Sequence, residues 1–157
     1  MAGIFKVNEV VAAAVEIEKR GEDFYRRLAQ KTENQAIRKD LEYLADEEVK
    51  HRKLFQSMVD RLEPIDLPAW SDEGEYYEYL SALIESHFLL EKKLSESLLS
   101  WVSNRREAVH LAMGFEKESI LFFMEMKELV PEGERTTVEK CIQEEREHLR
   151  RLKGMVG

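Results

Sequence analysis

The sequence predicts an all-α protein: a four-helix bundle built from two helical hairpins, joined by a long crossover that contains short helices. Apolar residues recur at helical spacing along four long segments. The chain has only 7 Gly and 3 Pro among 157 residues, which suits long helices with few irregular loops. Roughly 40 residues separate the second long segment from the third, and such a crossover between two hairpins is a known bundle connectivity. We therefore expect residues 1–157 to form a single domain.

The first hairpin should consist of two long helices with a short connection. The first helix is expected over residues 8–31, with Asn8 as a candidate N-cap. The second is expected to start at Thr32 or Asn34 and to end near residue 62, because Pro64 cannot continue a helix. The few residues between the two helices predict that they pack antiparallel.

The crossover is expected to combine a loop with short helices. Residues 63–72 hold two prolines and predict a loop. Helical spacing returns over residues 77–90, where several tyrosines predict packing of a crossover helix against the bundle. A further short helix is expected over residues 94–102.

Two capping patterns mark the second hairpin. Asn104 offers an N-cap with Glu107 in the capping-box position, and the helix that follows should run to about residue 130. Pro131 and Gly133 then predict a turn. The last helix is expected over residues 136–153, since Thr136 and the residue three positions later form another capping box.

Composition excludes several classes of partner. The net charge of −8 argues against nucleic acid and against an anionic membrane surface. No apolar run approaches the ~18 residues of a membrane span, and the N-terminus lacks the apolar core of a signal peptide. Cys141 is the only cysteine, so no intrachain disulfide can form. We expect a cytoplasmic protein with no nucleic-acid and no membrane partner.

Two Glu-Glu-x-x-His motifs carry the functional signal. They span residues 47–51 and 144–148, so the second repeats the first 97 residues later. A lone glutamate precedes each motif on another helix: Glu18 and, 98 residues later, Glu116. Each lone glutamate is followed at the sixth and seventh positions by two aromatic residues. Because the motifs and the lone glutamates repeat at nearly the same separation, the pattern indicates a duplicated hairpin.

The residues of this pattern that fall on apolar helix stripes are candidate metal ligands. Positions three apart share a helix face, so the second Glu and the His of each motif point the same way. Four uncompensated carboxylates on apolar stripes would be costly, whereas two divalent cations would neutralise them. The candidate ligands are Glu18, Glu48, His51, Glu116, Glu145 and His148. Ligation by oxygen and imidazole favours Fe or Mn over Mg or Ca, and without thiolates a structural Zn site is less favoured.

Neighbouring residues are expected to support such a site. Tyr25 could donate a hydrogen bond to a ligating carboxylate. Gly21 and Ser119, three positions after the lone glutamates, would leave room for an external ligand to reach the metals. Cys141 lies one turn before Glu145, where a small buried core residue is the simpler interpretation.

Other residues resemble ligands but fit the pattern less well. The spacing of Glu107 and His110 repeats Glu-x-x-His, yet His110 lies off the apolar stripe that carries Glu116. Glu107 can also be explained as a helix cap. His87 is interpreted as an ordinary core-edge or surface histidine. Glu47 and Glu144 precede the candidate ligands, point elsewhere on their helices, and are interpreted as solvated.

These residues resemble the rubrerythrin branch of the ferritin-like superfamily over nearly the whole chain. The matching stretches are Ala14 to Gly21 with Phe24 and Tyr25, Leu44 to Glu48 with His51, Ala112 to Glu116 with Ser119, and Glu144 and Glu145 with His148. The resemblance implies a ferritin-like bundle and a di-iron carboxylate centre held by the six candidate ligands, with Mn or Zn as other metals of interest. It also implies oxidation of Fe(II) by hydrogen peroxide or dioxygen, a role against oxidative stress, and a homodimer or larger assembly.

Two departures from the rubrerythrin pattern bear on the reaction. Rubrerythrins proper carry a C-terminal rubredoxin domain whose iron is held by four cysteines, whereas this chain has one cysteine. We therefore expect the electron donor to be a separate protein such as a rubredoxin. Rubrerythrins also carry an extra carboxylate one turn after the position of Glu116, where this chain has Ser119. That replacement bears directly on peroxidase efficiency.

Three functions remain open at this point. The leading one is a non-haem di-iron oxidoreductase of the peroxidase or ferroxidase type, with peroxide or dioxygen as substrate. The second is iron storage or delivery, for which storage requires a closed shell of subunits. The third is a non-enzymatic helical bundle that keeps a vestigial metal site for packing or for binding a partner.

Overall fold

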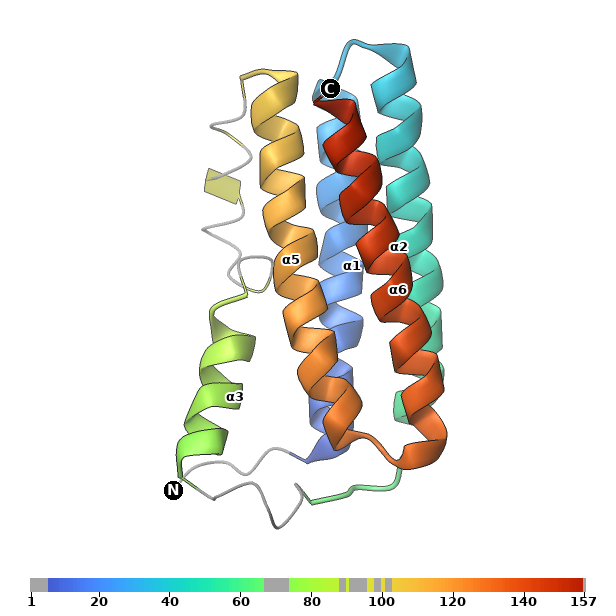
Figure 1. Cartoon of the computed structure of the whole chain (residues 1–157), viewed down its shortest axis with the longest axis vertical. Coiled ribbons are helices and arrows are strands. Elements are labelled where there is room, and N and C mark those ends of the chain that lie inside the picture. Colours follow the sequence, from blue (N-terminus) through green and yellow to red (C-terminus); the bar gives the residue numbers. More distant parts are fainter. Residues whose placement is uncertain are drawn as a thin grey trace.

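The structure is a computed structural model, which describes residues 6–66, 74–87, 90, 96–97, 100 and 103–156. Within these residues, four long helices lie side by side and a shorter helix flanks them (Figure 1). The long helices are α1 (Val7–Lys31), α2 (Gln35–Arg61), α5 (Arg105–Leu129) and α6 (Glu132–Met155), and the shorter one is α3 (Glu75–Glu85). The part of the chain described here contains no named strand. The predicted all-α class is therefore confirmed.

The four long helices form the two expected hairpins. Helix α1 packs against α2 and α5 against α6, while contacts of α1 with α5 and of α2 with α6 join the hairpins. The crossover carries α3, which lies alongside the lower part of α5 in Figure 1. Because each helix contributes one face to a common interior, the middle of the bundle receives side chains from all four.

The connection between α1 and α2 confirms one of the two predicted helix starts. The side chain of Asn34 accepts a hydrogen bond from the backbone N–H of Ile37 (3.1 Å), so Asn34 is the N-cap of α2. The guanidinium of Arg38 donates to the carbonyl oxygens of Ala29 (3.1 Å) and Thr32 (2.8 Å). These bonds satisfy the last carbonyls of α1 and hold the short loop against the second helix.

Two predicted helix starts are wrong. Helix α1 begins at Val7 rather than after Asn8, because the carboxylate of Glu9 accepts from the backbone N–H of Lys6 (2.6 Å) and caps the helix earlier. Helix α6 begins at Glu132, directly after Pro131, so the predicted turn at Gly133 and the predicted cap at residue 136 both lie inside the helix. Pro131 has φ −55°, which suits a helix start, and acidic residues in the first turn favour the helix dipole.

The start of α5 agrees with the sequence. The side chain of Asn104 accepts from the backbone N–H of Glu107 (3.0 Å), as the capping pattern predicts. The Glu107 carboxylate in turn accepts from the backbone N–H of Ser103 (2.8 Å). Glu107 therefore has the capping function that sets it apart from the candidate ligands.

The crossover differs from the prediction in length. Helix α3 starts two residues earlier than expected and ends at Glu85, so residues 86–87 and 90 are not helical. The hydroxyls of Tyr76 and Tyr79 donate to the two carboxylate oxygens of Glu125 on α5 (3.1 and 3.2 Å), which confirms that the tyrosines pack the crossover against the bundle. The short helix expected over residues 94–102 lies largely outside the described residues, as does the expected loop beyond residue 66.

The predicted apolar stripes form the core. The stripe residues of α1 and α2 are buried, and a group of phenylalanines fills the space between the hairpins. Phe55 on α2 and Phe123 on α5 have ring centroids 5.0 Å apart and bury their side chains completely. Complete burial of such a side chain contributes about 1.5–3 kcal/mol. No helix among these residues combines the length and the apolar character of a membrane span.

Candidate metal centre

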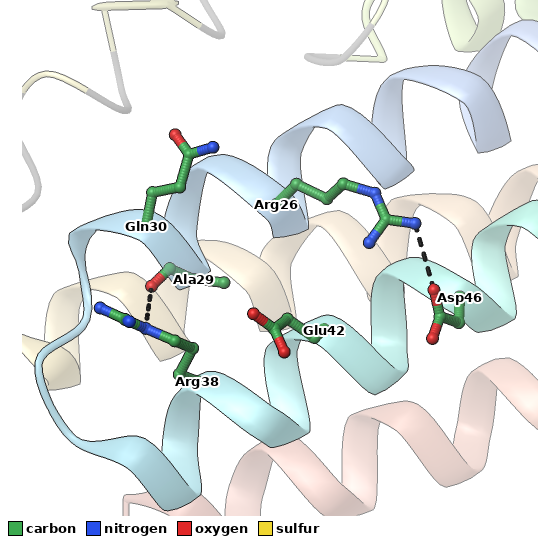
Figure 2. Close-up of a pocket in the computed structure, with 6 residues that line it drawn as sticks. All are labelled: Arg26, Ala29, Gln30, Arg38, Glu42 and Asp46. Atoms are coloured by element: carbon green, nitrogen blue, oxygen red, sulfur yellow. Dashed lines mark hydrogen bonds and ion pairs between the residues drawn. The ribbon is translucent and has the colours of Figure 1, made fainter.

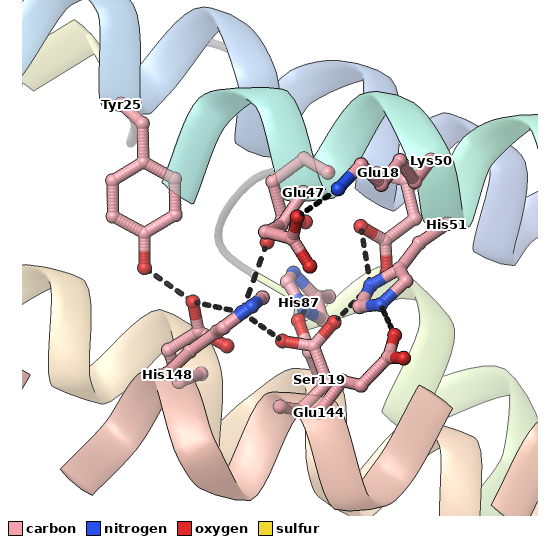
Figure 3. A network of polar contacts seen from close by, with 12 residues as sticks. Glu18, Tyr25, Glu47, Lys50, His51, His87, Ser119, Glu144 and His148 are labelled. Atoms are coloured by element: carbon pink, nitrogen blue, oxygen red, sulfur yellow. Dashed lines mark hydrogen bonds and ion pairs between the residues drawn. The ribbon is translucent and has the colours of Figure 1, made fainter. Parts of the chain in front are cut away.

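The interior of the bundle contains a cluster of charged side chains from all four long helices. Helix α1 supplies one carboxylate, α5 another, and α2 and α6 each supply a carboxylate and an imidazole (Figure 3). All six residues are at most 2% exposed: Glu18, Glu48, His51, Glu116, Glu145 and His148. The structure thus brings together every residue that the sequence predicted as a metal ligand.

The cluster divides into two groups that share two carboxylates. One group contains Glu18 and His51, the other contains Glu116 and His148, and Glu48 and Glu145 belong to both. Within each group, one ligand atom from every residue lies within 4.8 Å of the others. Ligand atoms on opposite sides of a metal ion are about 4.0–4.4 Å apart, because each bond is about 2.0–2.2 Å long. Each group therefore has the dimensions of a single metal site.

Both histidines present the same ring nitrogen to the carboxylates. His51 Nδ1 lies 2.7 Å from a carboxylate oxygen of Glu145 and 3.8 Å from one of Glu18. His148 Nδ1 lies 3.3 Å from the other Glu145 oxygen and 3.6 Å from oxygens of both Glu48 and Glu116. Glu145 directs one oxygen to each histidine, which is the arrangement of a carboxylate that bridges two ions.

Hydrogen bonding within the chain leaves the cluster unsatisfied. Every one of the six side chains has at least one buried oxygen or nitrogen without a hydrogen-bond partner: both oxygens of Glu18, Glu48 and Glu145, one of Glu116, and the Nδ1 of His51 and of His148. Even the 2.7 Å approach of His51 to Glu145 lacks the alignment of a hydrogen bond. Buried polar atoms are normally paired, so atoms that converge without pairing fit cation ligands. The residues present therefore fit two divalent metal ions.

Burial and mutual repulsion shift the carboxyl groups of the metal-free chain. The pKa of Glu18, of Glu48 and of Glu116 is raised, first by burial and then by the charge of Glu145. Burial alone would raise the pKa of Glu145, but the close approach of Glu116, His148 and His51 outweighs burial, so this pKa is lowered. The metal-free cluster therefore holds protons more strongly at Glu18, Glu48 and Glu116 than at Glu145. Divalent cations can replace those protons at the same positions.

The two imidazoles are shifted toward their charged form. Burial lowers the pKa of each ring, but the surrounding carboxylates outweigh it. The nearby carboxylates of Glu116 and Glu145 raise the pKa of His148 to about 10, and those of Glu144, Glu145 and Glu18 raise the pKa of His51. A metal ligand must present a neutral nitrogen, so metal binding would expel a proton from Nδ1 of each ring.

Tyr25 supports the cluster as the sequence predicted. Its hydroxyl donates to Glu116 in a short hydrogen bond, drawn at the left of Figure 3. The pKa of Tyr25 is raised well above its usual value, first by burial and then by the nearby Glu116 carboxylate. The phenol therefore stays protonated and donates to one oxygen of Glu116, which leaves the other oxygen free for a metal.

Glu144 has a function that sequence reasoning missed. Its carboxylate lies 2.6 Å from His51 Nε2, so that nitrogen donates while Nδ1 faces the cluster. The pKa of Glu144 is lowered, first by this hydrogen bond, so it stays charged. Its counterpart in the repeat, Glu47, is 8% exposed rather than solvated and pairs with Lys50 (2.5 Å). The sequence signal that could have indicated this contact is the first glutamate of each Glu-Glu-x-x-His motif.

The structure does not provide the open space expected beside Gly21. A Cβ atom on Gly21 would lie 2.8 Å from Cζ of Phe115 and 3.0 Å from Oε2 of Glu48. Gly21 therefore allows the ring and the ligating carboxylate to approach the backbone of α1, and the expected access route is wrong at this position. Ser119 is fully buried, and its hydroxyl lies 3.3 Å from Nε2 of His87.

The structure also places the three other residues that were weighed as possible parts of the site. His110 is exposed, which agrees with its exclusion from the ligand set. Cys141 is buried, and burial raises the pKa of its thiol to about 12, as expected for an unreactive core residue. His87 is 2% exposed and lies in the interior, rather than at the core edge or the surface.

A surface pocket of about 430 Å³ lies between α1 and α2, separate from the cluster (Figure 2). Its lining includes Arg26, which pairs with Asp46 (3.1 Å), and Arg38, which donates to the backbone of Ala29 (3.1 Å). These contacts join the two helices of the first hairpin. Both arginines of the lining are thus already paired within the hairpin.

Comparison with known proteins agrees with this geometry. The rubrerythrin family model matches residues 9–156. The chain belongs to the rubrerythrin family. Among solved structures, a protein from Thermotoga maritima described as a ferritin-like diiron-carboxylate protein is 28% identical, with a TM-score of 0.71. The match covers 99% of this chain and 97% of that one, whereas no curated protein matches the sequence.

Membership of the rubrerythrin family confirms the fold predicted from the connectivity. The bundle is ferritin-like, with two hairpins and a crossover, and its interior holds a candidate di-metal site of carboxylates and imidazoles. The family match also agrees with the sequence resemblance.

Proposed function

We propose that this chain is a di-iron oxidoreductase that reduces hydrogen peroxide or dioxygen while it oxidises Fe(II). The observation that carries the proposal is the sharing of Glu48 and Glu145 between two complete, buried ligand groups. Shared carboxylates would hold two metal ions close enough to act on one small substrate. The rubrerythrin-family match supports the same conclusion.

The metal pair would supply the two electrons that the reduction of one peroxide requires. The chain supplies the remaining conditions. Four helices exclude water from the ligands, which are at most 2% exposed. Tyr25 and Glu144 fix the orientation of one carboxylate and one imidazole through hydrogen bonds. Fixed and dry ligands stabilise charge changes at the metals with little reorganisation.

Electron donor and assembly belong to the proposal as well. Because the ligand set is complete within one chain, a homodimer would not be needed to build the site. We propose a separate protein, such as a rubredoxin, as the donor that returns the metals to Fe(II). The homodimer stays a prediction, which size-exclusion chromatography with light scattering tests directly.

The test is the rate of iron oxidation. Anaerobic protein loaded with Fe(II) is mixed with hydrogen peroxide or with dioxygen, and near-ultraviolet absorption is followed over seconds. We expect oxidation far faster than that of free Fe(II) in the same buffer, and loss of this advantage in Glu48→Ala. His110→Gln serves as the control, because its side chain is exposed and lies outside both ligand groups. Oxidation no faster than that of free Fe(II) would overturn the proposal.

The same experiment separates the alternatives. Faster reaction with dioxygen than with peroxide, together with accumulation of Fe(III) beyond the ligand groups, would favour ferroxidase and storage. A dimer in solution would exclude a storage cage made by this chain alone. Failure to bind Fe(II) would instead favour a bundle with a vestigial site.

A further inference from the structure

His87 is a buried titratable residue that neither ligand group uses. It belongs to the crossover, two residues beyond the end of α3, and only 1% of its side chain is exposed. Its ring packs edge-on against Phe115, with ring centroids 5.9 Å apart. The crossover thus inserts an imidazole into the bundle beside α5.

The two ring nitrogens of His87 face different environments. Nε2 lies 3.3 Å from the hydroxyl of Ser119, which is fully buried. Nδ1 lies 3.7 Å from a carboxylate oxygen of Glu118, whose side chain is 43% exposed. A small rotation of this half-exposed carboxylate would bring it within hydrogen-bond range. The ring therefore lies between a group that reaches solvent and a group that solvent does not reach.

Ser119 lies next to the candidate metal centre. It follows Glu116 by three positions on α5, so the two share a helix face, and both are fully buried. Figure 3 shows His87 and Ser119 among the side chains of the same polar network. When Nε2–H donates to the Ser119 oxygen, the serine hydroxyl remains free to donate a proton in turn.

We propose that His87 and Ser119 form a proton relay from the surface at Glu118 to the metal centre. This proposal rests on the proposed function, because reduction of one peroxide to two waters breaks the O–O bond and takes up two electrons and two protons. The electrons come from the oxidation of Fe(II). Nε2 of His87 gives up its proton to Ser119 as the serine hydroxyl passes its own proton inward. Nδ1 takes a proton from the Glu118 side in the same step, so the ring remains neutral. The ring returns to the form protonated at Nε2 before the second proton passes.

The burial of His87 agrees with transfer through a neutral ring. Burial lowers the pKa of His87 to about 4, so the imidazole carries a single proton at neutral pH. A neutral imidazole has one donor and one acceptor nitrogen, which is the requirement for relaying a proton. His87 acts through Ser119 and so positions the proton rather than touching the substrate.

The relay is tested with His87→Gln and Ser119→Ala in the iron-loaded protein. Glutamine keeps a donor near the position of Nε2 but cannot pass a proton through, and alanine removes the second link. Peroxide-driven oxidation should slow by about 10- to 100-fold in each variant, within the range of acid–base catalysis. The double variant should be no slower than either single variant, because both changes interrupt one path. Metal content should stay unchanged, and added imidazole should partly restore the rate of His87→Gln.

A second measurement does not depend on activity. In protein loaded with diamagnetic Zn(II), nitrogen NMR should show His87 protonated only at Nε2 and without titration between about pH 5.5 and 7.5, one unit either side of the ordinary value. A wild-type rate in His87→Gln and in Ser119→Ala would overturn the relay alone, and so would titration of His87 within this pH range. Absence of fast oxidation in the wild-type protein would overturn the relay and the proposed function together.

Discussion

Gly21 tests how closely the metal cluster is packed against α1. Replacement of Gly21 by alanine would place a methyl group 2.8 Å from Cζ of Phe115 and 3.0 Å from Oε2 of Glu48. Carbon atoms in contact are about 3.5–4.0 Å apart, so the ring would have to retreat by about 0.7 Å or more. Overpacking of this kind costs about 1–3 kcal/mol, and the displaced oxygen belongs to a carboxylate shared by both ligand groups.

The matched control is Gly114→Ala on α5. Gly114 also lies inside a long helix, but a methyl group there would meet nothing within 4 Å. Alanine favours a helix over glycine by about 0.8–1.0 kcal/mol, so Gly114→Ala should stabilise the fold by about that amount. Gly21→Ala gains the same helix propensity and loses it again to overpacking. The two variants should therefore differ by about 1–3 kcal/mol.

The assay is thermal unfolding of both variants, without metal and with metal. For a chain of this size, about 1 kcal/mol shifts the melting temperature by about 2–4 °C. Gly114→Ala should melt about 2–12 °C above Gly21→Ala, and only Gly21→Ala should bind metal more weakly than the wild type. Equal stabilisation by both substitutions, with unchanged metal binding, would refute the packing of Phe115 and Glu48 against α1.

Three further predictions concern the groups around the ligands. Tyr25→Phe removes the donor to Glu116 and should destabilise the metal-loaded protein by about 1.5–3 kcal/mol, measured by chemical denaturation; an unchanged midpoint would contradict the hydrogen bond. Glu144→Gln weakens the acceptor of His51 and should lower metal affinity by about 10- to 100-fold in calorimetry, whereas Glu47→Gln should lower it less; equal effects would show that Glu144 has no special function. The stability of the metal-free protein should fall as pH rises from about 5 to 9, because three carboxyl groups and two imidazoles have raised pKa values and the folded state binds more protons than the unfolded chain. Metal binding releases those protons, so the stabilisation by added metal should grow over the same pH range. A metal-free protein whose stability rises with pH would contradict the assigned pKa shifts.

The members of the buried cluster could be predicted from sequence because each lies on an apolar stripe at helical spacing. A charge at such a position must be compensated, and the repeat of 97 residues supplied the partners on the other hairpin. Spacing alone was insufficient, since Glu107 and His110 have the same spacing and neither belongs to the cluster. Periodicity combined with charge balance therefore carries more information than the motif itself.

Contacts between helices lay beyond the sequence. The hydrogen bond of Glu144 to His51 depends on how α6 rotates against α2, which periodicity within one helix does not specify. The same limitation explains the misjudged space beside Gly21, where the ring of Phe115 on α5 fills the volume. Helix ends were also uncertain where two caps competed, as at Glu132. In each case a residue from another element decided the outcome.

Metal stoichiometry tests the central claim most directly. Elemental analysis after Fe(II) reconstitution and removal of free metal should find two metal ions per chain, one for each ligand group. Glu18→Ala should retain about one, because Glu18 belongs to a single group, whereas Glu145→Ala should retain fewer, because Glu145 is shared. One metal or fewer in the wild-type protein, or equal loss in the two variants, would contradict a di-metal centre bridged by shared carboxylates.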